Sequence, residues 1–203
     1  NYFYILEKVL SENYLGVIFK PKVPRTIGQR LGEINDMLNE ATRTGRCYVL
    51  GDEGESYNQS IIHPVFAGLA ADVAVHGHLC GGTAAIECAL ANIPTLLIDR
   101  EGDPFNKLHN ELCGKNIVFT NWKDVISFII EDFKGIKRNG KFGMWPSDFL
   151  NEIDQFRDGK AAFRMGNYLK SLIDGFNSGL KRDDVLNMAA EKYISMYGKD
   201  KVL

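Results

Sequence analysis

Short apolar runs alternate with segments of helical periodicity along the first two thirds of the chain. The first run, YLGVIFK at residues 14–20, has the continuous apolar character of a strand buried on both faces. Further expected strands lie at residues 47–50, 72–75, 95–98 and 116–119. A helix with an apolar position every three or four residues separates the first two strands, and it is expected to start at Thr26 and to end at Gly45.

This alternation predicts an α/β fold, with a Rossmann-like parallel sheet, helices on both faces and right-handed crossovers. The pattern changes after Lys134, where residues 135–145 carry glycine, lysine and arginine with little periodicity. Two helical patterns follow and predict a C-terminal helical pair. We therefore expect a Rossmann-like domain at residues 1–134, and a linker with a helical extension packed on that domain at residues 135–203.

Composition excludes several classes of function. The 203 residues are 45% hydrophobic and carry a formal net charge of −2, which gives no global attraction to nucleic acid. The apolar runs are too short to span a membrane and the N-terminal segment lacks the layout of a secretory signal, so we expect a cytoplasmic protein. The 4 cysteines have no CxxC spacing and are typical of reduced thiols.

The stretch ADVAVHGHLCGGTAAIECALANIPTLLID at residues 71–99 contains the main candidate site. It combines an apolar strand, a glycine-rich bend that opens a helix, and a second apolar strand after a proline. Backbone N–H groups and the positive end of the helix dipole converge at Gly81, Gly82 and Thr83. Such a helix start can hold a phosphate or pyrophosphate without a cationic side chain.

Other candidates lie at the carboxyl ends of the expected strands, where ligands bind in doubly wound sheets. Lys20 or Lys22 supplies positive charge for a phosphate, and His76 donates toward a phosphate or sugar oxygen. Glu87, inside the helix that follows the glycines, accepts hydrogen bonds from a ribose diol. These parts together fit a nucleotide diphosphate.

Two further groups complete the predicted site. The loop that contains Gly51, Asp52 and Glu53 is the candidate for contact with the base or the ribose. Asp99 and Arg100, at the end of the fourth expected strand, are the candidates for contact with a sugar.

Simpler interpretations stay open at this point. The glycines equally fit close packing of the helix on the strand, with Glu87 on a solvated face. His76, His78 and Cys80 alternate along the chain, but the usual zinc spacings are absent, so no metal is expected. Cys80 as a nucleophile would need a paired base, and a buried or loop thiol is the favoured interpretation.

Residues 71–99 resemble the donor-binding motif in the C-terminal half of GT-B glycosyltransferases, where a strand, a glycine-rich turn and a helix with a glutamate precede a proline and another strand. Lys20-Pro21-Lys22 resembles the Lys-Pro-basic end of the first strand in that half. Residues 156–198 are similar to the tail of bacterial surface-polysaccharide biosynthesis proteins.

The resemblance implies that the substrate is a nucleotide sugar, with no metal and no other cofactor, and that a separate N-terminal domain holds the acceptor. Glu87 would then bond the ribose, the glycine turn would meet the diphosphate, and Lys20 would neutralise charge on the leaving group. Because the chain begins close to the first expected strand, we expect a donor-binding half that is inactive without the acceptor domain. Any peripheral membrane association would come through that domain, and no catalytic residue is assigned.

Two alternatives of other classes remain. A UDP-N-acetylglucosamine 2-epimerase-like domain also has two glycines shortly before a glutamate, and Asp99-Arg100-Glu101 partly matches its pattern after the fourth strand. The other alternative is a non-catalytic interaction module.

Overall fold

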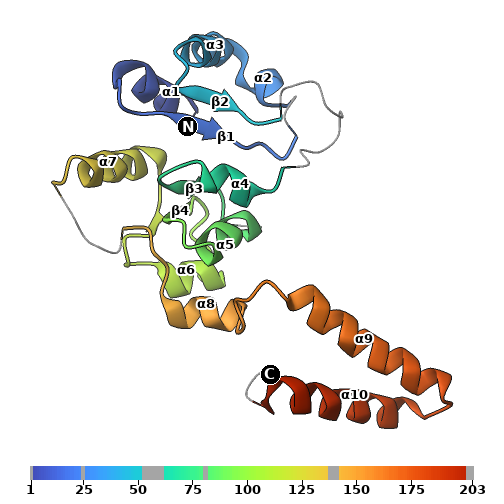
Figure 1. Ribbon diagram of the computed structural model, residues 1–203. Helices are drawn as coiled ribbons and strands as arrows, with labels where there is room; N and C mark the ends of the chain where they lie inside the picture. The colour runs from blue at the N-terminus through green and yellow to red at the C-terminus, as the bar shows by residue number, and fades with distance from the viewer. Residues whose placement is uncertain (1, 24–25, 52–61, 80–81, 137–141, 200–203) are drawn as a thin grey trace. The chain divides into compact units, whose positions relative to one another are not determined.

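The computed structural model describes residues 2–23, 26–51, 62–79, 82–136 and 142–199. The chain forms two compact units, Asn1–Pro146 and Ser147–Leu203. The first unit combines parallel strands with helices, and the described part of the second unit is helical (Figure 1). The predicted α/β class is therefore confirmed.

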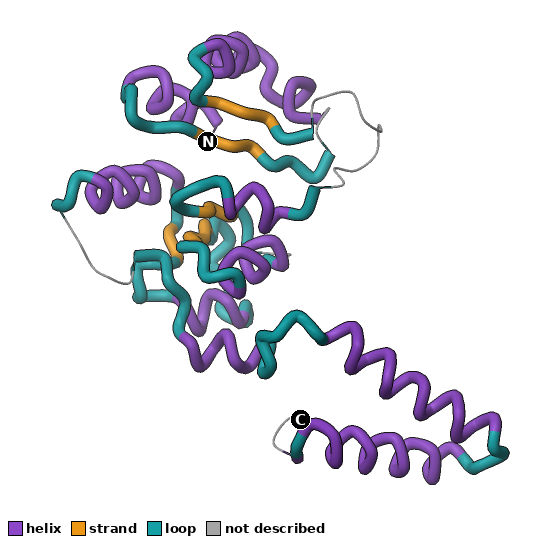
Figure 2. Tube along the Cα trace, viewed as in Figure 1, coloured by secondary structure: helices purple, strands orange, loops and turns teal. Residues whose placement is uncertain are grey.

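The strands of the first unit form two parallel sheets. β1 (Val17–Phe19) pairs with β2 (Cys47–Val49). β4 (Thr95–Ile98) pairs on one side with β3 (Ala74–His76) and on the other with β5 (Val118–Phe119). β4 is buried along its whole length, as its continuous apolar run predicted. Among the described residues, the expected single sheet is thus divided into a two-stranded and a three-stranded part (Figure 2).

Helices alternate with these strands as the sequence predicted. α1 (Tyr2–Ser11) and α3 (Asn35–Arg43) pack on each other in the half of the unit that contains β1 and β2. α5 (Thr83–Leu90) packs on β3 and β4. The other helical segments of this unit are α2 (Thr26–Leu31), the 3-10 turn η1 (Gly32–Ile34), α4 (Pro64–Leu69), α6 (Lys107–Leu112) and α7 (Trp122–Phe133).

The long helix predicted between Thr26 and Gly45 is interrupted near its middle. Gly32 has a φ of +52°, a left-handed conformation that a continuous right-handed helix does not contain. The chain passes through η1 before α3 begins. The apolar spacing nevertheless predicted the buried face correctly, because Leu31 and Leu38, on either side of the break, belong to one core cluster.

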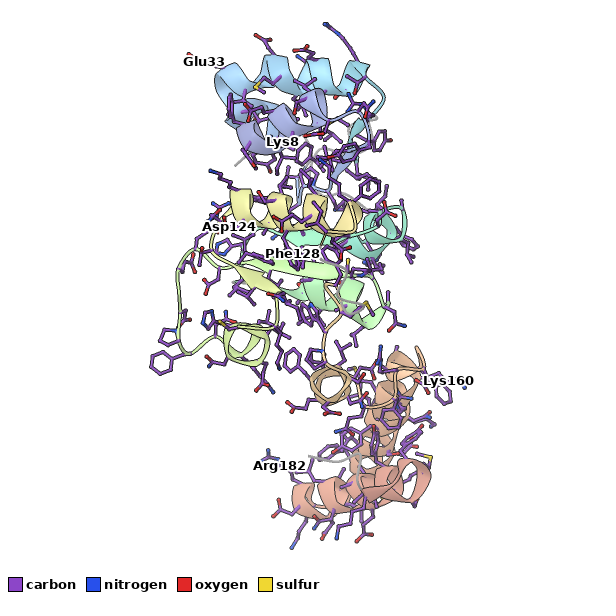
Figure 3. The ribbon with its side chains drawn as sticks, turned by 90° about the vertical axis from the view of Figure 1, so that its left-hand side faces the viewer. Lys8, Glu33, Asp124, Phe128, Lys160 and Arg182 are labelled. Atoms are coloured by element: carbon purple, nitrogen blue, oxygen red, sulfur yellow. The ribbon has the colours of Figure 1, made fainter. Side chains whose placement is uncertain are left out.

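α7 joins the two halves of the first unit. Ile126 packs into the cluster formed by α1, β1, α2, α3 and β2, whereas the preceding Val125 packs with Leu96 and Ile98 of β4. Phe128 also faces the three-stranded sheet, with its ring centroid 5.2 Å from that of Phe119 on β5 (Figure 3). The same helix therefore closes two hydrophobic cores.

The chain after α7 returns to the sheet before the first unit ends. The backbone N–H of Thr95 donates to the carbonyl of Gly143 at 2.7 Å, and the indole Nε1 of Trp145 donates to the carbonyl of Thr95 at 2.9 Å. These bonds attach residues 142–146 to β4. The boundary between the compact units consequently follows Pro146, whereas the sequence analysis placed it after Lys134.

The second unit contains α8 (Ser147–Ile153) and the predicted helical pair, α9 (Ala161–Asn177) and α10 (Arg182–Tyr197). The two long helices pack at Gly175, where a Cβ atom would lie 3.0 Å from side-chain atoms of Val185 and Met188. A glycine at this position therefore allows the close approach of α10. The packing of this pair on the first unit remains a prediction.

None of the helices in the described part of the chain has both the length and the apolar character needed to cross a membrane.

Candidate functional site

The predicted site residues lie where the parallel strands end. Lys20 follows β1, His76 is the last residue of β3, and Asp99 and Arg100 follow β4. A cavity of about 1880 Å³ is lined by residues of both sheets and by the start of α5. It brings together five of the predicted residues, which are Lys20, Lys22, His76, Thr83 and Arg100.

Lys20 and Glu87 influence each other across this region. Partial burial lowers the pKa of the Lys20 amine, and the negative charge of Glu87 opposes that shift by raising the same pKa. The Nζ of Lys20 also donates to the carbonyl of Pro21 at 3.2 Å. The end of β1 therefore presents a cation whose charge is stabilised by the acid that the sequence analysis assigned to the ribose.

Glu87 retains capacity to accept hydrogen bonds. Its Oε2 atom is buried and has no hydrogen-bond partner among the residues that the structure describes. The pKa of the neighbouring Cys88 thiol is raised, first by burial and then by the charge of Glu87. A buried carboxylate oxygen without a partner carries a desolvation cost, which a hydroxyl donor would relieve.

His76 is held in its neutral form at the end of β3. Burial, and to a lesser extent the charge of His78, lower the pKa of the His76 ring. Its Nε2 atom is buried and unpaired within the described part of the chain. A neutral imidazole can donate or accept at this atom, depending on its tautomer.

The start of α5 combines packing with a helix terminus. Gly82 is the N-cap residue, no side chain caps the helix there, and Thr83 opens it. A Cβ atom at Gly82 would lie 2.5 Å from Cδ1 of Leu108 on α6. The second glycine of the motif therefore allows the close approach of the flexible Leu108 side chain, which fits the packing interpretation at this position.

Asp99 is engaged inside its own loop. Its Oδ1 accepts the backbone N–H groups of Glu101 and Gly102 at 3.0 and 2.9 Å, and its Oδ2 lies 2.6 Å from Nδ1 of His109. Burial alone raises the pKa of this carboxyl group, but these hydrogen bonds and His109 hold it below its usual range. Asp99 thus orders the loop after β4, while the adjacent Arg100 lines the cavity.

The remaining predicted residues fall outside this cluster or outside the described chain. Gly51 occupies a turn after β2 with a φ of +89°. Asp52 and Glu53 of the proposed base or ribose loop lie outside the described residues, as do Cys80 and Gly81 of the glycine turn.

Sequence reasoning missed Trp122 and His109. Trp122, the first residue of α7, lines the cavity, and its buried Nε1 atom has no partner in the described part of the chain. The Asp99 to Gly102 spacing is typical of an acidic side chain that accepts backbone N–H groups in a turn, but it gives no indication of His109. Trp122 has no comparable local signal.

Among the described residues, no group of His, Cys, Asp or Glu side chains has an arrangement that could hold a metal ion. No protein-family model matches this chain, and no match was found among curated proteins or solved structures.

Proposed function

We propose that the first unit binds a nucleotide sugar, as the donor-binding half of a glycosyltransferase of bacterial surface-polysaccharide biosynthesis. The observation that carries this proposal is the meeting of Lys20, His76 and Thr83 at one cavity, close to Glu87. Lys20 and the start of α5 offer donors to a diphosphate, and the unpaired oxygen of Glu87 accepts from a ribose hydroxyl.

The order of the elements supports the same assignment. Ligands of parallel α/β sheets bind beyond the carboxyl ends of the strands, and the candidate residues occupy those ends. In the glycosyltransferases that the sequence resembles, a separate domain holds the acceptor. Donor binding, rather than turnover, is therefore the activity that we propose for these residues.

Isothermal titration calorimetry with UDP, GDP, CDP, CMP and UDP-N-acetylglucosamine tests the proposal. We expect saturable binding of at least one nucleotide, and a loss of affinity of roughly 10- to 100-fold in Glu87→Gln, because a hydrogen bond to a charged group is removed. Glu33→Gln is the matched control, since Glu33 is exposed on η1 (Figure 3). Absence of binding, or equal affinity in both variants, would contradict the proposal.

Product analysis separates the enzyme alternatives. If UDP-N-acetylglucosamine is converted to free UDP and an epimerised sugar, the epimerase-like alternative replaces the transferase. If no nucleotide binds and Glu87→Gln behaves as the control does, the interaction module is the better explanation.

A further inference from the structure

Trp122 has a donor that the fold leaves unused at the wall of the cavity. The indole packs against the cluster formed by β4 and Val125, and also against the cluster that contains Ile126. It therefore lies at the junction of the two cores that α7 joins. Its Nε1–H is buried and pairs with no acceptor among the described residues. Buried N–H groups in native proteins are nearly always paired, so an unpaired one at a cavity wall needs an explanation.

Gly77 places the indole in this position. A Cβ atom at Gly77 would lie 3.0 Å from Cζ2 of Trp122 and 3.8 Å from Cε2, the ring atom bonded to Nε1. The aromatic ring therefore packs closely on the backbone of the residue that follows His76, and a Cβ atom at Gly77 would require the ring to shift.

The other tryptophan, Trp145, differs from Trp122 because its indole N–H has a hydrogen-bond partner within the fold. Trp145 is 5% exposed, and its Nε1–H donates to the carbonyl of Thr95 at 2.9 Å. Both indoles pack in the first unit, but only the N–H of Trp145 takes part in a hydrogen bond of the fold that the structure describes. The difference points to a role for Trp122 outside the fold itself.

The chemistry of the cavity indicates which ligand group the indole would meet. Lys20, Arg100 and Trp122 line the cavity, and the polar atoms of these three side chains only donate hydrogen bonds, although carboxylates such as Asp72 and Asp132 line other parts of it. Side chains that only donate fit a ligand group that only accepts. Phosphate oxygens are such a group, whereas sugar hydroxyls and most bases also donate.

We propose that the Trp122 indole N–H donates a hydrogen bond to a diphosphate oxygen of the bound nucleotide. This inference rests on the proposed nucleotide-sugar function and adds a contact that the glycine motif does not contain. Because the N–H is shielded from solvent, the indole must turn toward the ligand to form the bond. Binding should therefore change the fluorescence of Trp122 and leave that of Trp145 nearly constant.

Fluorescence of single-tryptophan variants tests the inference. Trp145→Phe leaves Trp122 as the reporter, and Trp122→Phe leaves Trp145. Each variant is titrated with the nucleoside diphosphate that binds in calorimetry and with the corresponding nucleoside. We expect a saturable change of emission in Trp145→Phe with the diphosphate, and a much smaller one in Trp122→Phe.

Affinity gives an independent readout. Trp122→Phe keeps an aromatic ring but removes the donor, so we expect roughly tenfold weaker binding of the diphosphate and unchanged binding of the nucleoside. Gly77→Ala, which displaces the indole, should weaken diphosphate binding in the same direction. Circular dichroism verifies that each variant is folded, and if Trp122→Phe is not, the titration of Trp145→Phe decides.

The outcomes separate this inference from the proposed function. If the unmodified protein binds a nucleoside diphosphate while Trp122 emission does not change, or while Trp122→Phe binds with full affinity, the indole contact is refuted and the proposed function stands. If calorimetry detects no nucleotide at all, both are refuted.

Discussion

Polar groups at two neighbouring strand ends of the three-stranded sheet differ in whether they have hydrogen-bond partners. At the end of β4, both carboxylate oxygens of Asp99 have partners in the loop and in α6. Nε2 of His76, at the end of β3, is by contrast buried without a partner among the described residues, and the same holds for Oε2 of Glu87 on α5 and Nε1 of Trp122 at the start of α7. β3 and β4 are adjacent and parallel, so the difference does not arise from the strand architecture.

The contrast distinguishes a structural polar group from one available to a ligand. The desolvation cost at Asp99 is offset by hydrogen bonds within the fold, which stabilise the native state. The unpaired atoms of His76, Glu87 and Trp122 carry that cost without compensation from described residues. Unpaired buried groups are uncommon in native proteins and often mark functional positions.

The largest effect is expected for Asp99→Ala. This change removes two backbone hydrogen bonds and the contact with His109, so the free energy of unfolding should fall by about 2–4 kcal/mol. Urea denaturation followed by circular dichroism measures it. Asp103→Ala is the control, since the Asp103 side chain accepts an exposed hydrogen bond from Phe105 N–H at 2.9 Å, and this substitution should cost less than about 1 kcal/mol. Equal losses in the two variants would show that the loop after β4 is not specially ordered.

We expect His76 and Asp99, at the two strand ends, to affect the stability of the protein in different pH ranges. The pKa of His76 is lowered by burial, so the unfolded chain binds a proton first and stability falls as the pH drops below about 6.5. The pKa of Asp99 is lowered by its partners, so its contribution is present above about pH 3.9 and is lost as the pH falls through the folded-state pKa.

Melting temperatures measured from pH 3 to pH 8 check this division. His76→Asn should reduce the fall in melting temperature below about pH 6.5 and leave the fall at acid pH unchanged. Asp99→Ala should reduce the fall at acid pH and leave the one below about pH 6.5 unchanged. The assignment of His76 and Asp99 to different pH ranges is wrong if either variant changes the melting temperature equally in both ranges.

A smaller effect separates the two tryptophans. Trp145→Phe removes the donor to the carbonyl of Thr95 and should lower the free energy of unfolding by about 1–2 kcal/mol. Trp122→Phe also loses apolar contacts of the indole but removes an N–H that has no partner among the described residues, so its cost should be the smaller of the two. Denaturation midpoints by far-ultraviolet circular dichroism compare them, because this signal does not depend on indole fluorescence. An equal or greater loss for Trp122→Phe would contradict this difference between the two tryptophans.

The smallest effect on stability is expected for Glu87→Gln. A neutral amide of the same shape relieves the desolvation of an unpaired carboxylate oxygen but also removes the attraction to Lys20, so the net change should stay within about 0.5 kcal/mol. Thermal melts without nucleotide measure this change. A strong destabilisation would place Glu87 with Asp99 among the structural acids.

Local pattern was sufficient for much of the fold. The apolar runs predicted the positions of β1 to β5, and the helical spacing predicted the buried faces of α2 and α3. The break at Gly32 was missed because an apolar period continues across a glycine whatever its φ. The attachment of Trp145 to β4 was missed because its partner, Thr95, is 50 positions away in the chain.

The candidate site was likewise predicted only in part. Strand order predicted that Lys20, Asp52, His76 and Arg100 would lie at the same edge as the glycine turn, because parallel strands end on the same side. Asp52 lies outside the described residues, and the other three line one cavity with Thr83. Strand order did not indicate that Asp99 would be bonded within its loop, although the spacing from Asp99 to Gly102 is a local signal for those bonds. Nor did it indicate that Trp122 would contribute from α7, because this depends on contacts between residues far apart in sequence.

For this protein the sequence by itself determined the α/β class, the strands and the polar residues at their ends, because these depend on local periodicity and chain order. Only the tertiary structure decided which of these polar groups have partners. Hydrogen-bond satisfaction depends on which segments meet in space. Asp99 is paired by its own loop and by α6, and Trp145 by the distant Thr95, whereas Glu87 and Trp122 each have a buried polar atom without a partner among the described residues.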